Sequence, residues 1–257
     1  MIGKDVIRGF LLWRIWLNWA WIDVKQRYRR SVIGPFWSTI SLGVSVVGIG
    51  GVFSILWNVE THALLPHLAT GLILWTFIST SVNEGTAVFA GSAHVIKAIN
   101  LPMSVHVFRF IARNAILFAH NFIIYIAVFF IFSLPLNTNT LLILPALLLY
   151  LLNAVWVVLL LGVVCTRYRD IPQIIQNVML IFFFVTPIFW FSETLGDAQI
   201  IVKLNVFAHF LDLARLPLLG KSPQSETWMV VGAVTLVGWA LALPLYERYH
   251  RRAASWV

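Results

Sequence analysis

Side chains that could catalyse a reaction or bind a nucleotide are scarce in this 257-residue chain. Gly220–Ser222 reads GKS, the end of a phosphate-binding loop, but such a loop needs another glycine five positions earlier, where the chain has Arg215. Histidine, cysteine and acidic residues do not fall at zinc-site spacings, and no GxSxG motif occurs. We therefore expect a chain that is not an enzyme, binds no cofactor or metal and leaves ATP hydrolysis to another protein.

One acid, Glu84, and one histidine, His120, fall well inside the apolar stretches of the chain. A carrier coupled to protons or sodium usually buries several ionisable groups along its path, so one carboxylate favours that class only weakly. The alternative is a Glu84 satisfied by Asn83, Thr86 or a nearby cation. His120 and Asn121 are expected to form a hydrogen-bonding pair between helices.

The densest group of charges is basic and lies near the start of the chain. Lys25, Arg27, Arg29 and Arg30 fall within six positions, and no charged residue follows from position 31 to 59. On a helical projection of residues 7–29 the two faces differ. One face carries Phe10, Trp13, Leu17, Ala20, Trp21, Val24 and Tyr28, and the other carries Arg14, Asn18, Lys25 and Arg29. Residues 1–30 are therefore predicted to form an amphipathic helix in the membrane interface, either as an anchor alone or also as a docking site for a cytoplasmic partner.

Composition sets the class of protein that must position these residues. The chain is 60% hydrophobic and 11% charged, whereas soluble domains carry about 25% charged residues, so we predict an all-α integral membrane protein. The net charge of +8 does not indicate nucleic-acid binding here, because the cations follow the membrane topology described next. The single cysteine, Cys165, excludes an internal disulfide.

Six stretches are long and apolar enough to be transmembrane helices within a membrane domain of residues 31–257. Their predicted bounds are 32–57, 68–89, 112–134, 141–165, 174–191 and 228–245. Of the 18 Lys and Arg residues, all but Lys203, Arg215 and Lys221 fall in one set of alternate flanking segments. The positive-inside rule then predicts that both termini are cytoplasmic.

The segment of residues 192–227 is the long one on the predicted outer side. Apolar residues at 200–216 favour two short helices, near Ala198–Leu204 and Val206–Leu216. Each is too short to span and too apolar for open water, so re-entrant helices that form an outer gate are expected. The alternative is a lid that only stabilises the bundle.

Several motifs together resemble the type 2 ABC exporter permeases, the membrane subunits of O-antigen and related polysaccharide exporters. They are VKQRYRRSVIGPFW (24–37), VIKAINLPMSVHVFR (95–109), RYRDIPQII (167–175), VTPIFW (185–190) and LNVFAHFLDLARLPLLG (204–220). Their order and spacing cover essentially the whole chain. The family commonly has proline where this chain has Val206 after Asn205.

The resemblance implies a homodimer with two separate P-loop ATPase subunits that bind ATP and Mg²⁺, in the bacterial inner membrane. The cargo would be a lipid-linked polysaccharide of the O-antigen type, without any nucleic-acid partner. ATP-driven closure of the ATPases would act on the interface helix and the 95–103 loop, where Pro102 ends or redirects a short helix after Ile96–Leu101.

The resemblance also assigns roles by position. The residues implied to contact the ATPase are Ile96, Lys97, Asn100, Leu101, Pro102, Arg14 and Lys25. Those implied at an inner gate or anchor are Arg27, Tyr28, Arg29, Arg167, Arg169 and Asp170. Those implied at the outer gate are Pro187, Asn205 and Arg215.

The Arg167–Asp170 run has a plainer alternative, an inner-face anchor with an internal ion pair. Candidates for the polymer path are Tyr28, Phe36, Trp37, Trp57 and Trp75, since aromatic rings suit the C–H faces of sugars. The alternative for each is an interface or packing residue.

Other functions remain open from sequence. The same machine could move teichoic acid, a glycolipid or a drug, and an ion-coupled secondary carrier is a less favoured class. A membrane-embedded enzyme is disfavoured, because paired acids and a metal set are missing.

Overall fold

The structure is a computed structural model of the chain, and it describes residues 3–29, 33–34 and 36–256. Every regular element in these ranges is a helix, as composition predicts. The longer helices are α1 (Lys4–Leu11), α2 (Trp13–Arg27), α3 (Phe36–Leu56), α4 (Thr61–Asn83), α5 (Ala93–Ala98), α6 (Ser104–Ile131), α7 (Ile143–Arg167), α8 (Ile171–Val185), α9 (Ile200–Leu204), α10 (Val206–Leu218) and α11 (Ser225–Trp256). Short 3₁₀ turns are η1 (Gly85–Ala87), η2 (Ala90–Ser92), η3 (Thr138–Leu142) and η4 (Ser192–Gln199).

Among the described residues, five helices are long and apolar enough to cross a membrane, namely α3, α4, α6, α7 and α11. The predicted fifth span, 174–191, is wrong in its length. Its helix, α8, has 15 residues, or about 22 Å at 1.5 Å per residue, less than the roughly 30 Å of a bilayer core. The helix ends at Val185 because Thr186 is extended, as expected for a residue that precedes proline.

Two other predicted spans shift along the chain. The second span, predicted from Leu68 to Phe89, is α4 and ends at Asn83, so Glu84 caps the helix and does not lie well inside it. The third was predicted to begin at Ala112, but α6 begins at Ser104. Its early arginines do not end the helix, because carboxylates on other elements pair with them.

The first and last spans also differ from their predicted bounds. The first span was predicted from Val32, which lies outside the described residues, and α3 ends at Leu56. The last helix, α11, continues well beyond the predicted Leu245 to Trp256, because its final turns bury Tyr246 and Ala253 against the bundle.

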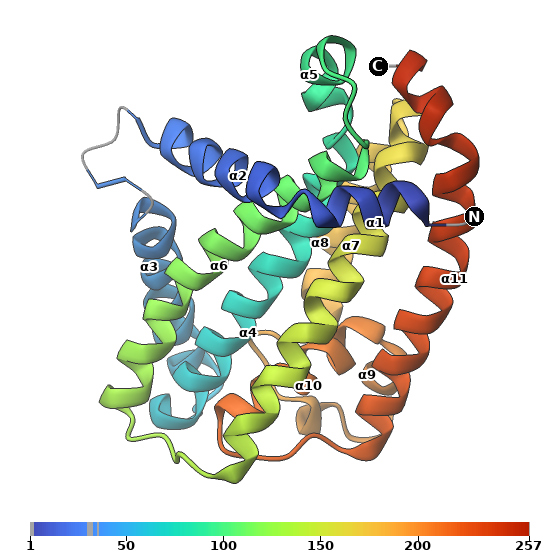
Figure 1. The fold of residues 1–257 in the computed structure, drawn as a ribbon. Coiled ribbons are helices and arrows are strands. Elements are labelled where there is room, and N and C mark those ends of the chain that lie inside the picture. The colour runs from blue at the N-terminus through green and yellow to red at the C-terminus, as the bar shows by residue number, and fades with distance from the viewer. Residues whose placement is uncertain (1–2, 30–32, 35, 257) are drawn as a thin grey trace.

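The predicted interface helix is two helices, with a break at Leu12 between α1 and α2. Both pack on α6 and lie across the ends of the spans (Figure 1). Ala20 and Val24 are buried in this contact, whereas Trp13 and Trp21, predicted on the same face, are about half exposed. The predicted apolar face therefore has two environments. Its smaller residues, Ala20 and Val24, contact α6, and its tryptophans remain partly exposed.

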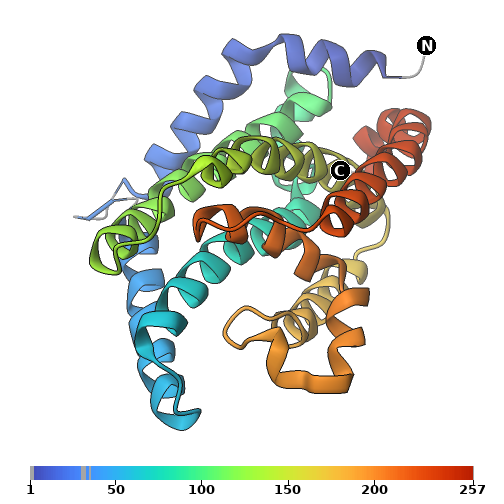
Figure 2. The ribbon, with the colours of Figure 1, turned by 90° about the horizontal axis from the view of Figure 1, so that it is seen from below.

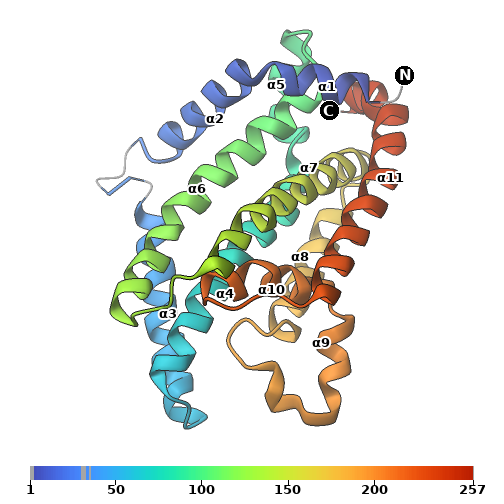
Figure 3. The same ribbon diagram turned by 60° about the horizontal axis from the view of Figure 1, so that its bottom comes forward.

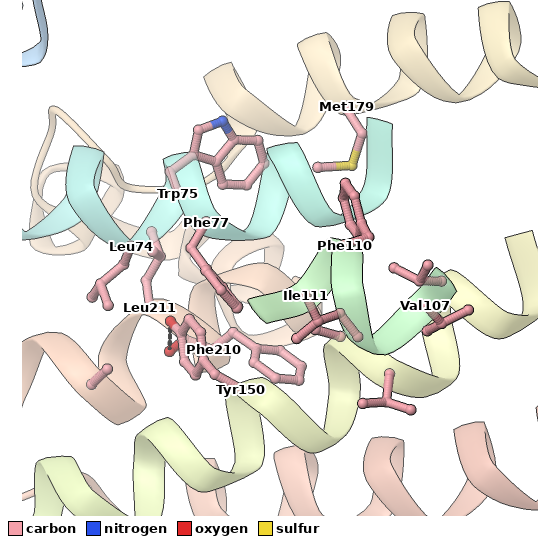
Figure 4. Packing of buried hydrophobic residues seen from close by; sticks show 14 of the residues in the cluster. Leu74, Trp75, Phe77, Val107, Phe110, Ile111, Tyr150, Met179, Phe210 and Leu211 are labelled. Atoms are coloured by element: carbon pink, nitrogen blue, oxygen red, sulfur yellow. Dashed lines mark hydrogen bonds between the residues drawn. The ribbon is translucent and has the colours of Figure 1, made fainter. Parts of the chain in front are cut away.

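The most central helix is α4. In its most apolar stretch 61% of residues are buried, against 17% for the peripheral α3 (Figure 2). Phe77 of α4, Tyr150 of α7 and Phe210 of α10 meet in the core (Figure 4). The Tyr150 hydroxyl donates a hydrogen bond to the Phe210 carbonyl at 2.7 Å. These contacts hold α10 inside the bundle, between α4 and α11 (Figure 3).

The bundle has two distinct ends. One, here called the α5 end, carries α1, α2, α5 and the last turns of α11, and the other, the α10 end, carries α9 and α10 (Figure 1). The Gly3 amide donates to Glu247 Oε1 at 3.0 Å, so the two terminal regions meet at the α5 end. The two short helices predicted in 192–227 are present as α9 and α10.

The two ends should face opposite sides of the membrane. Cysteines introduced as Ala98→Cys and Ser222→Cys are exposed at the α5 and α10 ends, and the native Cys165 is buried. In intact spheroplasts an impermeant maleimide should label Ser222→Cys at once and Ala98→Cys only after permeabilisation, because the cation-rich end stays inside. Labelling of both from the same side would contradict this arrangement.

Candidate functional site: polar contacts at the two ends of the bundle

The α5 segment, residues 93–103, stands out from the end of the bundle (Figure 1). Its helix, Ala93–Ala98, ends where Ile99 becomes extended, so the helix predicted over Ile96–Leu101 was placed three residues too late. Ile96 packs against the core, while Lys97 and Asn100 are exposed. Leu101 and Pro102 are half-buried and lead into α6. The segment thus presents a polar tip on an anchored base.

Asp5 joins the α5 segment to the interface helices. Its carboxylate accepts hydrogen bonds from the Ser104 amide at 3.1 Å and from the Tyr246 hydroxyl at 2.6 Å. The Ser104 hydroxyl donates to the Asp5 carbonyl at 2.7 Å. A carboxylate at the first turn of a helix satisfies a free amide and stabilises the helix dipole. Asp5 of α1 therefore fixes the start of α6, directly after the α5 segment, and the end of α11.

Gly9 allows this close approach. A Cβ at Gly9 would overlap the Ser104 hydroxyl oxygen and lie 3.1 Å from the Val105 backbone nitrogen, so glycine is needed for this close crossing of α1 and α6.

Ion pairs connect α2 to the spans. Asp23 accepts two hydrogen bonds from the Arg109 guanidinium, at 2.6 and 2.5 Å. Glu84 pairs with Arg113 at 2.6 Å and with Arg27 at 3.5 Å. Glu84 is thus satisfied by cations, as one sequence interpretation expected. The geometry links α2, the end of α4 and the first half of α6.

The other predicted inner residues lie around this network. Tyr28 lines a 160 Å³ cavity with Arg27, Glu84 and Asn121, and Arg29 is exposed. Two exposed cations of α2 lie over tryptophan rings of the same helix. Arg14 is 5.3 Å from the ring centroid of Trp13, and Lys25 is 5.4 Å from that of Trp21.

The RYRD run connects α7 and α8 at the α5 end. Arg167 lies over the Trp256 ring, 5.1 Å from its centroid, which joins the ends of α7 and α11. Tyr168, Arg169 and Asp170 are exposed. An anchoring contact for this run is therefore present through Arg167.

At the α10 end, Arg215 is buried, with 3% of its surface exposed. Its Nη1 donates to the Pro187 carbonyl at 2.6 Å and lies 2.9 Å from His67 Nε2. Its Nη2 donates to Asp212 at 2.5 Å. One guanidinium thus ties α10 to α4 and to the chain after α8.

Asn205 completes this cluster. Its side-chain oxygen accepts from the Phe207 amide at 3.0 Å, which caps α10, and its Nδ2 donates to the Thr186 hydroxyl at 2.9 Å. A capped helix start needs no proline at Val206, which explains how the chain tolerates this departure from the family pattern.

The three predicted outer residues, Pro187, Asn205 and Arg215, therefore lie together at the end of α8. Sequence reasoning missed Asp212 and His67. Asp212 had a signal, since it precedes Arg215 by three positions on a predicted helix, whereas His67 is 148 positions away.

The aromatic candidates occupy different environments. Trp75 is buried between Phe183 and Phe207, as a packing residue would be. Trp57 stacks on Phe53 with ring centroids 4.3 Å apart. Phe36 and Trp37 are exposed at the start of α3.

The His120–Asn121 prediction is half right. Asn121 accepts a hydrogen bond from Thr39 of α3 at 3.1 Å, whereas His120 lies 2.7 Å from the Ile116 carbonyl of its own helix.

Comparison with known proteins gives one family and several relatives. The family described as ABC-2 type transporter matches residues 14–219. The O-antigen export system permease protein RfbA of Myxococcus xanthus is 21% identical over 237 residues, which is 88% of each chain. A protein of the same name from Klebsiella pneumoniae is 21% identical over 176 residues, 68% of each chain.

Loss of the Asp23 charge should loosen the interface helices. Asp23→Asn leaves the partly buried Arg109 without its carboxylate, at an expected cost of about 2 kcal/mol, and should lower the midpoint of thermal unfolding in detergent. Asp170→Asn, at an exposed site, is the matched control and should change little. The double variant Asp23→Arg with Arg109→Asp restores an opposite-charge pair and should unfold at a higher temperature than Asp23→Asn. Equal unfolding midpoints for Asp23→Asn and Asp170→Asn would contradict the assigned role of the Asp23–Arg109 pair.

Arg215→Lys should release α10. A lysine ammonium cannot reach the Pro187 carbonyl, Asp212 and His67 as the planar guanidinium does. Hydrogen exchange of the 206–218 amides should become at least tenfold faster, about 1.4 kcal/mol of lost protection. Arg169→Lys, at an exposed position, should leave these amides unchanged. Unaltered exchange in Arg215→Lys would contradict a tethering role.

Proposed function

The chain belongs to the ABC-2 type transporter family, and on that premise we propose that it is the membrane subunit of an ATP-driven exporter of lipid-linked polysaccharide. The observation that carries this proposal is the match of residues 14–219 together with the relatives named as O-antigen export permeases. One of them corresponds to this chain over 88% of both lengths, so the correspondence is not confined to one segment. The cargo is a glycan of the O-antigen type, moved out of the cytoplasm.

ATP hydrolysis belongs to a partner chain, which binds ATP and Mg²⁺. The sequence lacks a complete phosphate-binding loop, since Arg215 stands where its first glycine is needed. Two copies of this chain and two P-loop ATPase subunits make up the transporter. The distribution of Lys and Arg supports an inner-membrane orientation with both termini in the cytoplasm.

The α5 end receives the ATPase. The polar tip of the α5 segment projects there, beside α1 and α2 (Figure 1). Asp5 connects the interface helix to the start of α6, and Asp23 with Glu84 connects α2 to α4 and α6. Because these contacts are short and partly buried, ATPase closure moves the interface helices and both spans together and opens a path between the two copies.

The α10 end is the outer gate, and α8 with the non-helical residues 186–191 after it forms the sixth crossing. α9 and α10 are re-entrant, which agrees with the burial of α10 among α4, α7 and α11. The Arg215 cluster holds this gate closed at rest. Opening requires the guanidinium to leave the Pro187 carbonyl, a contact that a new partner must replace.

An ion-coupled carrier fits the geometry less well. The Glu84 carboxylate is already paired with Arg113 at 2.6 Å and with Arg27 at 3.5 Å, so cations of the protein itself occupy the position that a transported ion would need.

The test is purification of the tagged protein from its own cell in a mild detergent, with mass spectrometry of the proteins that accompany it. A stoichiometric P-loop ATPase is expected. After reconstitution of this pair into vesicles, translocation of the lipid-linked glycan should require ATP. The control replaces the phosphate-binding lysine of the ATPase, which should abolish transport while the complex stays assembled. Transport by the permease alone, without ATP, would overturn the proposal.

A further inference from the structure

A polar cleft at the α5 end carries unused hydrogen-bonding groups. It has a volume of about 560 Å³ and lies between the end of α4, the first turns of α6 and the start of α8. Small-molecule sites commonly have volumes of roughly 300–1,000 Å³. Its charged lining residues are Asp23, Glu84, Arg109 and Arg113. The ionic network described above therefore forms one wall of a space large enough for a ligand.

In the part of the chain that the structure describes, three buried side-chain polar atoms have no hydrogen-bond partner. They are Asn83 Oδ1, His106 Nδ1 and Arg113 Nε, and all three residues line this cleft. Buried polar groups without partners are rare and destabilise the folded state. Their concentration in one cleft indicates a site that a ligand completes.

His106 carries the strongest signal, because only 2% of its surface is exposed. The side chain of Arg113 also differs from that of Arg109, one turn earlier. Both Nε and Nη2 of Arg109 donate to Asp23, whereas Arg113 uses Nη2 for Glu84 and leaves Nε unbonded. The unused groups are thus one donor, one amide oxygen and one imidazole nitrogen.

The charges around the cleft indicate an uncharged ligand. Both guanidiniums that line it already face a carboxylate, so the four charged side chains sum to zero. An anion would approach Asp23 and Glu84 without an unpaired cation to hold it. A hydroxyl group suits the free atoms better, because it both donates and accepts. It would satisfy the Asn83 amide in either orientation of that amide.

The lining also includes apolar side chains. Phe110, Val88 and Pro172 contribute hydrocarbon surface, and the Phe110 ring centroid lies 5.0 Å from the Arg113 guanidinium. Phe110 of α6 lies where Met179 of α8 approaches it (Figure 4). A sugar ring, with hydroxyls at its edge and C–H bonds on its faces, can contact both the polar and the apolar lining residues. We propose that the cleft binds a neutral sugar unit through Asn83, His106 and Arg113.

This inference deepens the proposed function and rests on it for the source of the sugar, which is one residue of the exported glycan. The cleft adjoins the α5 segment through Gly91 and Ser92 and the interface helix through Asp23. A sugar held there contacts the elements that would receive the ATPase.

The test uses the full-length protein in lipid nanodiscs, because detergents with sugar headgroups would occupy the cleft. A cysteine at the rim, Gln176→Cys, reports occupancy through its rate of reaction with a maleimide, since Gln176 lines the cleft and the native Cys165 is buried. Gln173→Cys is the matched control, on the same helix and exposed but outside the cleft. The probes are the methyl glycosides of glucose, galactose and mannose, with inorganic phosphate as the anionic contrast.

At least one methyl glycoside should slow labelling of Gln176→Cys fivefold or more in a saturable manner, without affecting Gln173→Cys. Phosphate should have no effect. The corresponding octyl glycoside, below its micelle concentration, should act at lower concentration if the site takes the sugar from a lipid-linked chain, and at equal concentration if it takes free sugar. Protection by phosphate but not by sugars, or by no probe, would overturn the proposal.

Substitutions locate the binding groups. Asn83→Ala and Arg113→Lys, each combined with Gln176→Cys, should weaken protection at least tenfold, since Arg113→Lys keeps the charge facing Glu84 but removes Nε–H. The control is His120→Ala, which lies on α6 like Arg113 but outside the cleft, and it should leave protection unchanged. Protection that survives both cleft substitutions would overturn the assignment.

The assay needs neither ATP nor a partner protein, so its failure is distinct from failure of the proposed function. If sugars protect Gln176→Cys but no ATPase copurifies, the sugar site is supported and the exporter proposal fails. If transport requires ATP but no sugar protects Gln176→Cys, the exporter proposal is supported and the sugar site fails.

Discussion

The rest of the structure depends on one electrostatic constraint, that a charge within an apolar bundle must have a partner. Moving an unpaired ion out of water costs several kcal/mol even after relaxation. Arg109 and Arg113 lie on a predicted spanning helix and face Asp23 and Glu84. Arg215, almost wholly buried, faces Asp212 and a backbone carbonyl. Each pairing joins different elements or fixes a helix end, so the requirement for partners also determines which elements are held together.

The two ends use this constraint differently. At the α5 end the pairs are partly exposed, and they connect an interface helix to α4 and α6. Such pairs transmit a displacement while water can still reach them. At the α10 end the guanidinium is enclosed and contacts three groups. Releasing it requires all three contacts to be lost together.

Much of this architecture could be predicted from sequence, and the failures have physical causes. Apolar length located the spanning helices, and the resemblance brought Pro187, Asn205 and Arg215 together by role before the structure brought them together in space. Hydropathy alone placed the end of the fifth span too late, although the residue before Pro187 already indicated a break. The start of α6 could not be seen, because the partner of Arg109 lies 86 positions away. No local pattern reveals a partner at that distance.

The same constraint explains why a neutral ligand could act on an ionic network. Asp23 and Glu84 both line the 560 Å³ cleft and hold α2 against the spans. A sugar bound beside them excludes water, and ion pairs strengthen as the local dielectric constant falls. If the cleft binds sugar, α2 is held more firmly while cargo is present. By linkage, any partner that favours the docked position of α2 then raises the affinity for sugar by the same factor. Cargo recognition and ATPase engagement would be coupled through Asp23 and Glu84 without direct contact between sugar and ATPase.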